Sequence, residues 1–286
     1  MPDFNFLKDS RGRWIISAPK RAKRPNNEEH NSFCPFCPGM EKKSEEVFRV
    51  GNKEKWSVRV IKNSFPFADI HEVIIHSPDH HKNFDELPLN QNIEIFRTLM
   101  NRFSLHKDSG RVFIFHNHGE AGGESITHPH TQLAVIPFDV DAEIPPLPDL
   151  SERGEIKETS QFQIFCPMAS EWPDEVWIKP KREGAFFPDM EEGELSDFSK
   201  TVYKILQIFT LRYHHEFPFN FYIYPDSDWY LRFIPRMKVL GGFEIGTKIP
   251  VNTQDPKETL EFIKRHFDEL DSESAREEKW DYEVGV

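Results

Sequence analysis

The chain has 286 residues, and its 48 acidic and 36 basic side chains give it a formal net charge of −12. This acidic balance argues against general nucleic-acid binding, which requires a basic surface. No stretch reaches the ~20 consecutive apolar residues that span a bilayer, and the N-terminus shows no signal-peptide pattern. We therefore expect a cytoplasmic protein that binds neither nucleic acid nor membranes and builds its core from 37% hydrophobic residues.

The first half of the chain carries several strand-like patterns and one helix-like pattern. Short β-rich runs bounded by turn residues predict strands at 13–17, 56–61, 71–76, 112–115 and 133–136. Apolar residues at helical spacing predict a helix over 91–103. A proline-rich segment, 144–148, and a charged segment, 151–158, follow, so we place a domain boundary at residue 150.

The second half, residues 151–286, has a similar coarse order of elements. Its predicted strands and helices are strands at 162–165, 175–178, 219–224 and 229–234 and helices at 195–213 and 256–270. A glycine segment, 241–246, follows the last strand, and we expect the acidic tail 271–278 to be mobile. The common order of strands, a helix and two more strands indicates a structural repeat.

Three cysteines occur, an odd and small number that does not indicate a disulfide framework. Cys34 and Cys37 form a Cys-Pro-Phe-Cys pair, the spacing of half a zinc site or of a redox dithiol. A redox pair would lie between a strand and a helix, whereas the residues that flank this pair are loop-like, so we favour zinc. Cys166 is alone, and we expect it to be a small buried hydrophobic residue.

The stretch 122–132 gives the strongest chemical signal. Its glycine and polar residues are Gly122, Gly123, Ser125, His128, His130 and Gln132. If the segment from residue 128 is extended, the period of two puts His128, His130 and Gln132 on one face. A lone histidine is more often a strand residue in contact with solvent. Two imidazoles and an amide beside a glycine loop, however, indicate chemistry at phosphorus.

With these residues in view, the sequence resembles the galactose-1-phosphate uridylyltransferase family of the histidine-triad superfamily, and within it the ADP-glucose phosphorylase-like branch. The matching segments span nearly the whole chain. They are 13–16, 21–25, 34–39, 77–80, Asn117 with Gly119, 128–132 and 241–247. The His-Pro-His-x-Gln segment together with the Cys pair is specific, whereas each of the others is weak alone.

The resemblance implies an α+β fold of two histidine-triad-like halves, each an antiparallel sheet with packed helices. Residues 1–150 would carry the zinc site and the nucleophile, and residues 151–286 would complete the substrate pocket. The ligands that the resemblance implies for one structural zinc ion (Zn²⁺) are Cys34, Cys37, His80 and His128. Spacing alone leaves His76 and His81 as alternatives to His80.

The resemblance also assigns roles in the reaction. His130 would be the nucleophile that attacks the α-phosphorus of a nucleotide sugar, and Gln132 and Ser125 would bind the phosphate oxygens. The further substrate-binding residues that it implies are Arg21, Arg24, Asn63, Asn117, Gly122, Gly123, Phe243, Glu244 and Thr247. From spacing alone, the basic cluster 20–24 would be a solvated surface patch. In the family this segment can act across a dimer interface, so a homodimer is implied.

The implied activity is ping-pong nucleotidyl transfer from a nucleoside diphosphate sugar to a sugar 1-phosphate, as in the hexose-1-phosphate uridylyltransferases of galactose metabolism. One alternative is an ADP-glucose phosphorylase-type enzyme that uses inorganic phosphate. A hydrolase is a second alternative, which Gln132 disfavours because hydrolases of the superfamily carry a third histidine there. A non-catalytic, zinc-stabilised binding protein is a third, disfavoured by the presence of both His130 and Gln132. Nothing in the sequence decides between uridine and adenine.

Overall fold

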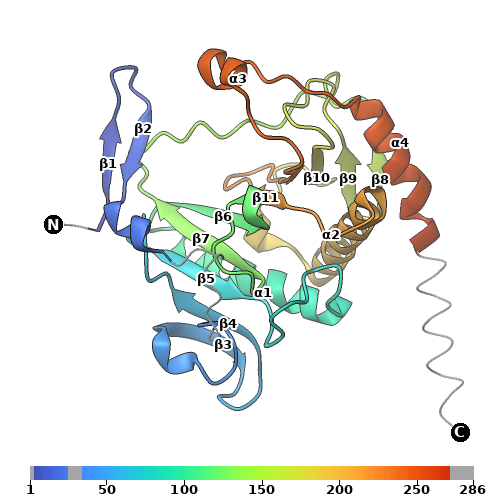
Figure 1. The fold of residues 1–286 in the computed structure, drawn as a ribbon. Helices are drawn as coiled ribbons and strands as arrows, with labels where there is room; N and C mark the ends of the chain where they lie inside the picture. The colour runs from blue at the N-terminus through green and yellow to red at the C-terminus, as the bar shows by residue number, and fades with distance from the viewer. Residues whose placement is uncertain (1–2, 25–33, 271–286) are drawn as a thin grey trace, which may run out of the picture.

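The structure is a computed structural model that describes residues 3–24 and 34–270. Within these residues the main sheet has ten strands: β3 (Glu46–Gly51), β4 (Trp56–Lys62), β5 (His71–Ile75), β6 (Arg111–His118), β7 (His130–Ile136), β8 (Lys157–Glu158), β9 (Phe162–Phe165), β10 (Val176–Pro180), β11 (Phe219–Ile223) and β12 (Leu231–Pro235). The helices are α1 (Leu89–His106), α2 (Glu192–Tyr213), α3 (Gly242–Thr247) and α4 (Pro256–Phe267), with short 3-10 turns η1 (Pro19–Lys23), η2 (Glu41–Lys43), η3 (Glu120–Gly122) and η4 (Phe187–Asp189). A separate hairpin, β1 (Asn5–Lys8) and β2 (Trp14–Ser17), projects to one side (Figure 1).

The strand order of the main sheet is β3-β4-β5-β7-β6-β11-β12-β10-β9-β8, and every pairing in it is antiparallel. The order β3-β4-β5-β7-β6 of the first half returns in the second as β8-β9-β10-β12-β11. Each half also has its long helix between its third and fourth strands. The predicted antiparallel sheets with packed helices are therefore confirmed, but the two sheets join through β6 and β11 into one continuous sheet. The boundary at residue 150 stays a prediction.

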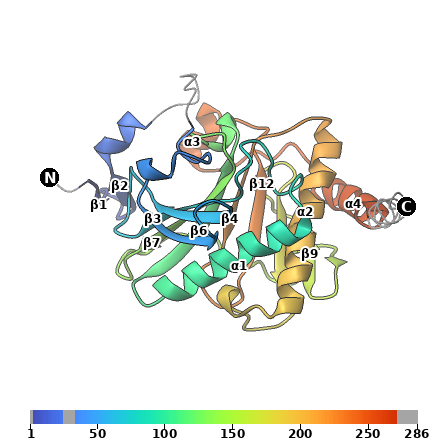
Figure 2. The ribbon, with the colours of Figure 1, turned by 90° about the horizontal axis from the view of Figure 1, so that it is seen from below.

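Helices α1 and α2 lie side by side on one face of the sheet (Figure 2). Phe96 of α1 and Phe198 of α2 have ring centroids 4.8 Å apart and share the main core with Val112 and Ile114 of β6. Burial of a phenylalanine side chain stabilises the fold by roughly 1.5–3 kcal/mol. Because strand residues alternate between faces, the other residues of β6 point away from the helices. We call this face, which neither α1 nor α2 covers, the uncovered face, and it carries the candidate site.

The strands and helices predicted from the sequence are present, with ends that differ by three residues or fewer. Strand β3 has no counterpart in the prediction, because Glu46 and Arg49, which form an ion pair, break its apolar pattern. The glycine segment forms helix α3, where the Glu244 side chain accepts a hydrogen bond from the backbone N–H of Gly241 at 2.8 Å. The tail 271–278 lies outside the described residues. Within those residues, no helix combines the length and the apolar character needed to cross a membrane.

Candidate active site and metal centre

Two cysteines and two histidines from three segments of the chain meet near the start of β7. The ligand atoms of Cys34, Cys37, His80 and His128 all lie within 4.8 Å of one another. The Sγ atom of Cys37 is 3.3 Å from Nδ1 of His80 and 3.6 Å from Nδ1 of His128. The Sγ atom of Cys34 is 3.7 Å from Nδ1 of His128. The structure thus brings together the four residues that the resemblance implied as metal ligands.

The three distances from the cysteine sulfurs to the histidine nitrogens fit a tetrahedral metal site. Bonds of about 2.3 Å to sulfur and about 2.0–2.1 Å to nitrogen place tetrahedral ligands roughly 3.3–3.8 Å apart. Nε2 of His128 donates to the carbonyl oxygen of Ser77 at 2.8 Å, and Nε2 of His80 lies 3.2 Å from Oγ1 of Thr127. Each Nδ1 atom is therefore left for a metal. Burial and the adjacent Cys34 thiol raise the pKa of Cys37 to about 11, so a metal bound here must displace its proton.

The structure separates His80 from the alternatives that spacing left open. His76 lies on the helix-covered face, where its Nε2 is 2.8 Å from Oγ1 of Thr131. The same hydroxyl is 3.2 Å from Nδ1 of His116, and burial lowers the pKa of both histidines well below the ordinary value. Among the described residues, neither His76 nor His81 belongs to the metal cluster.

His130 begins β7 and is held as a neutral imidazole with one free nitrogen. The residue is 6% exposed, and its Nδ1–H donates to the backbone carbonyl of His128 at 2.9 Å. Desolvation lowers the pKa of His130 to about 4, so Nε2 keeps its lone pair at neutral pH. His128 precedes the strand and turns toward the cysteines. His130 and Gln132 share one face of the strand, whereas the condition that the segment is extended from residue 128 is not met, and His128 lies with its predicted metal-binding partners.

Gln132 is oriented by a histidine that the sequence did not single out. Its Oε1 accepts a hydrogen bond from Nδ2 of Asn63 at 3.3 Å and lies 3.1 Å from Nε2 of His71. Nδ1 of His71 accepts from the backbone N–H of Phe67 at 3.3 Å, so Nε2 carries the proton and donates to Gln132. Burial lowers the pKa of His71 to about 4. With Oε1 engaged, the amide NH₂ of Gln132 is left to donate to a ligand.

A sequence signal for His71 exists in β5. The period of two puts His71 on the same face as Val73, and Val73 is the register partner of Gln132. Recognising this requires the pairing of β5 with β7, which the linear pattern does not contain.

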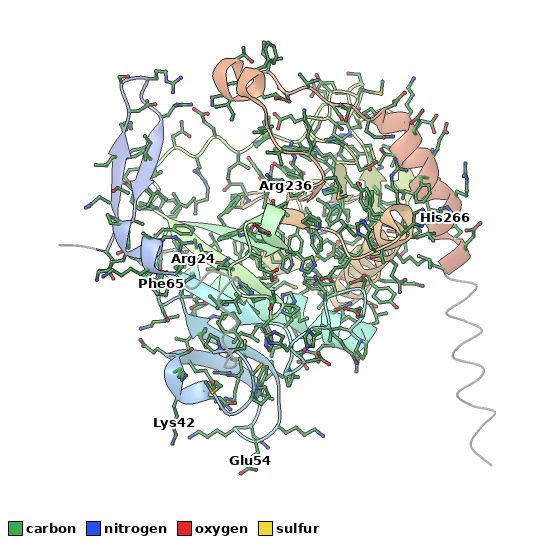
Figure 3. All side chains as sticks on the ribbon, viewed as in Figure 1. Arg24, Lys42, Glu54, Phe65, Arg236 and His266 are labelled. Carbon is green, nitrogen blue, oxygen red and sulfur yellow. The ribbon has the colours of Figure 1, made fainter. Side chains whose placement is uncertain are left out.

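A cavity of about 270 Å³ opens beside His130 on the uncovered face of the sheet. The predicted site residues in its wall are Arg24, Asn63, Ser125, His130 and Gln132. The rest of the wall is largely apolar and comes from Pro35, Phe36, Ile61, Phe65, Val73 and Ile126, with Lys43, Ser44 and Ser64 among them. Figure 3 shows Arg24 and Phe65 close together on the side of the molecule that carries the β1–β2 hairpin. Apolar walls with a few convergent polar groups are typical of ligand sites, whose volumes start at about 300 Å³.

Arg21 lies beside this wall. Its guanidinium donates to the carbonyl oxygen of Phe65 and lies 4.9 Å over the ring of Phe67. Burial and the nearby charge of Arg24 lower the pKa of Arg21 to about 10. Arg21 thus holds the loop that carries Phe65, while Arg24 reaches the cavity itself.

Asn117, Gly122 and Gly123 lie further along the uncovered face. Nδ2 of Asn220 donates to Oδ1 of Asn117 at 2.9 Å and to the carbonyl oxygen of Gly122 at 2.7 Å. A Cβ atom at Gly122 would come 2.9 Å from the backbone oxygen of Phe219, so the site requires a glycine. Gly123 has φ 79°, a left-handed conformation that favours glycine.

The predicted residues of α3 do not line the cavity. Figure 1 shows α3 at the top of the molecule, away from β7. Phe243 is 57% exposed, and Oγ1 of Thr247 donates to the carbonyl oxygen of Phe243 at 2.7 Å. Glu244 forms an ion pair with Lys238. Contact of Phe243, Glu244 and Thr247 with a hexose phosphate stays a prediction.

Comparison with known proteins agrees with this geometry. The family model described as "Galactose-1-phosphate uridyl transferase, N-terminal domain" matches residues 69–135, which run from β5 into β7. ADP-glucose phosphorylase of Arabidopsis thaliana is 26% identical over 88% of this chain and 90% of its own length. Galactose-1-phosphate uridylyltransferase of Thermotoga maritima is 24% identical over 91% of this chain and 96% of that protein.

The chain is related to the galactose-1-phosphate uridylyltransferase family. Its fold is similar to that of a solved structure, an ADP-glucose phosphorylase from Arabidopsis thaliana with bound ADP-glucose. That structure superposes with a TM-score of 0.71 and 25% sequence identity, over 91% of this chain and 98% of that chain. The likeness extends over nearly the whole chain, as the motifs predicted.

Proposed function

We propose that the chain is a nucleotidyltransferase that carries a nucleoside monophosphate on His130 between a nucleoside diphosphate sugar and a phosphate-bearing acceptor. The observation that supports this most is the 2.9 Å hydrogen bond from Nδ1–H of His130 to the carbonyl of His128, which leaves Nε2 as the free nitrogen beside the cavity. The relatives are named uridylyltransferases and ADP-glucose phosphorylase, both enzymes of nucleotide transfer.

The reaction proceeds in two displacements at the α-phosphorus. Nε2 of His130 attacks it, the N–P bond forms, and the bond to the bridging oxygen breaks so that sugar 1-phosphate leaves. The ring becomes cationic, and the carbonyl of His128 stabilises it through Nδ1–H. An oxygen of the acceptor's phosphate then attacks the same phosphorus, the N–P bond breaks, and the neutral imidazole is restored.

Polar groups around His130 bind the charge of the transferred phosphate. The NH₂ of Gln132 and the hydroxyl of Ser125 donate to its non-bridging oxygens, and Arg24 offsets their charge. Because an amide has no proton to transfer at neutral pH, Gln132 does not assist attack by water, which favours a long-lived intermediate. The apolar wall, which includes Phe36 and Phe65, suits the base and ribose.

The metal that we propose for Cys34, Cys37, His80 and His128 is zinc. Two thiolates and two imidazoles with no open position are typical of a structural zinc site. Zinc there ties the cysteine loop to the residues that precede β7, and its chemical contribution is this cross-link alone. His128 then holds the carbonyl that orients His130, while the transfer itself depends on the residues of the cavity.

A hexose 1-phosphate is the first candidate acceptor, and inorganic phosphate is the second, because one relative is an ADP-glucose phosphorylase. The test incubates the protein with UDP-glucose or ADP-glucose and with either galactose 1-phosphate or phosphate. A nucleoside diphosphate galactose indicates a hexose-1-phosphate uridylyltransferase-type enzyme, and a free nucleoside diphosphate indicates a phosphorylase. Activity in neither arm, or equal activity in His130→Ala, would refute the proposal.

A homodimer is part of this proposal, through the apolar surface of residues 237–251. Val239 is 84% exposed, and Phe243 and Ile249 are also largely exposed. Large apolar patches are rare on monomers, and several exposed apolar side chains within one short segment favour an interface here. Light scattering should give the mass of two chains, and Val239→Asp with Ile249→Asp should give one. A monomeric unsubstituted protein would contradict this part of the proposal.

A further inference from the structure

The uncovered face continues beyond the nucleotide cavity, across β6, β11 and β12. The register of β6 with β7 ends with His116 opposite Thr131, one residue before Asn117 on β6, and Asn117 is paired with Asn220 of β11. At about 4.8 Å between neighbouring strands, Asn220 lies roughly 10 Å from β7 across the sheet. The cavity lies on the other side of β7, where β4 and β5 contribute Ile61 and Val73.

Arg236 follows the end of β12 and reaches back over this part of the face. Its Nη1 donates to Oδ1 of Asn220 at 2.7 Å, and its guanidinium carbon lies 4.5 Å over the ring of Trp172. Its Nε is buried and has no hydrogen-bond partner in the described part of the chain. Figure 3 shows Arg236 toward the middle of the molecule, whereas His266 lies at its edge.

Arg236 also lacks a counter-ion. Among residues 3–24 and 34–270, no carboxylate forms an ion pair with it. Arg232, four residues earlier on β12, has Glu175 at 2.8 Å and Glu171 at 2.9 Å. Burial lowers the pKa of Arg236, the sign expected for a guanidinium whose charge nothing nearby offsets. A partly buried cation of this kind favours an anionic ligand.

Asn220 connects Arg236 to the glycine loop beside His130. Its NH₂ bonds to Asn117 and to the carbonyl of Gly122, and its Oδ1 accepts from Arg236. All of its polar atoms are therefore engaged, which holds the guanidinium on the face of the sheet that carries His130 and Gln132.

We propose that Arg236 binds the phosphate group of the acceptor, a phosphate monoester or inorganic phosphate, on the side of His130 opposite the nucleotide. This role rests on the proposed nucleotidyl transfer. Before transfer, Arg236 binds the β-phosphate of the donor at the same position, and that phosphate departs with the donor's sugar before the acceptor binds. The guanidinium donates to the phosphate oxygens through Nη2 while Nη1 stays bonded to Asn220. The substrate thus lies across β7, with its base toward β4 and its sugar phosphate toward β12.

The test separates the transfer of label to an acceptor, which involves the acceptor's phosphate, from the labelling of His130, which does not. A radiolabelled nucleoside 5′-phosphorimidazolide labels His130 with imidazole as the leaving group, so no second phosphate takes part. The labelled full-length protein is then given galactose 1-phosphate in one arm and inorganic phosphate in the other. Variants Arg236→Gln and Arg236→Lys are compared with Arg111→Gln, which removes an arginine at the far end of β6 that pairs with Asp226.

We expect Arg236→Gln to accept label from the phosphorimidazolide at the normal rate. Its transfer of label to an acceptor should require about 10- to 100-fold more acceptor, the effect of losing charge-assisted hydrogen bonds. The acceptor concentration that Arg236→Lys requires should lie between those of Arg236→Gln and the unsubstituted protein, and Arg111→Gln should match the unsubstituted protein. The arm that shows the larger loss identifies the acceptor.

Unchanged acceptor dependence in Arg236→Gln would overturn the assignment. If Arg236→Gln slowed labelling by the phosphorimidazolide as much as it slowed transfer to the acceptor, the assignment would be overturned too. General damage to the site would then explain both effects. Failure of the unsubstituted protein to take up label from the phosphorimidazolide would refute the nucleotidyl transfer itself.

Discussion

Replacing His71 by phenylalanine tests whether this histidine acts through Gln132. The imidazole lies 4.2 Å from the ring of Phe67, so a phenyl ring of similar size fits the space. The replacement leaves Oε1 of Gln132 with Asn63 alone, at 3.3 Å. The amide can then rotate and present its oxygen, rather than its NH₂, to the phosphate.

The size of the effect follows from the bond that is lost. A hydrogen bond to a charged phosphate contributes about 1.5–3 kcal/mol, and about 1.4 kcal/mol corresponds to a factor of ten. We therefore expect kcat/KM to fall about 10- to 100-fold in His71→Phe and in Gln132→Ala. The backbone N–H of Phe67 also loses its acceptor, which destabilises the fold by about 1–3 kcal/mol, so the assays belong well below the unfolding temperature.

The decisive assay is a double-mutant cycle on kcat/KM. If His71 acts by orienting Gln132, the double variant should be no slower than Gln132→Ala within about twofold. If the two losses multiply, His71 acts independently and the reasoning is wrong. His106→Phe is the matched control, because His106 contacts Oε1 of Glu72 at 3.0 Å on the helix-covered side of β5. It should lower stability and leave kcat/KM unchanged.

Two further predictions concern the metal and the pH dependence of stability. Cys37→Ser should reduce bound zinc from about one per chain to near zero by elemental analysis, whereas Cys166→Ser should retain it; full zinc in Cys37→Ser would contradict the assignment. The pKa of His71 is about 4 in the fold and 6.5 in the unfolded chain, so the unfolded state binds more protons between these values and stability falls as pH decreases through this window. In urea unfolding, His71→Phe should lose about 3 kcal/mol less than the unsubstituted protein between pH 6.5 and 4, while the exposed control His215→Gln should follow the unsubstituted curve; an identical slope in His71→Phe would contradict the assigned burial.

The local elements were predictable because each one carries its pattern within a few residues. The apolar spacing of α1 and the short apolar run of β7 depend on nothing distant. For the metal cluster, spacing predicted only the Cys-x-x-Cys pair as half of a zinc site, and the two histidine ligands followed from the family resemblance. The period of two does not apply to His128, because the strand begins at His130. His128 lies two residues before the strand, and its side chain points toward Cys34 and Cys37.

The residues that the sequence did not reveal depend on pairing between distant strands. His71 meets Gln132 because β5 pairs with β7, and Asn220 meets Asn117 because β11 pairs with β6. The second pairing also joins the two halves into one sheet. Strand periodicity identifies which residues share a face, but it does not say which strands are neighbours. Arg236 has no local signal, because its missing counter-ion is a property of the packed structure.

The most direct test of the account is the isolation of the covalent intermediate. The protein is mixed with a nucleoside diphosphate sugar without acceptor, and the mass of the intact chain is measured. The chain is then digested with a protease at alkaline pH, which preserves acid-labile N–P bonds, and the masses of the peptides are measured. We predict an added mass of one nucleoside monophosphate on the peptide that contains His130, removed when sugar 1-phosphate or phosphate is added. No adduct in the unsubstituted protein during turnover, or an adduct that persists in His130→Ala, would contradict the account.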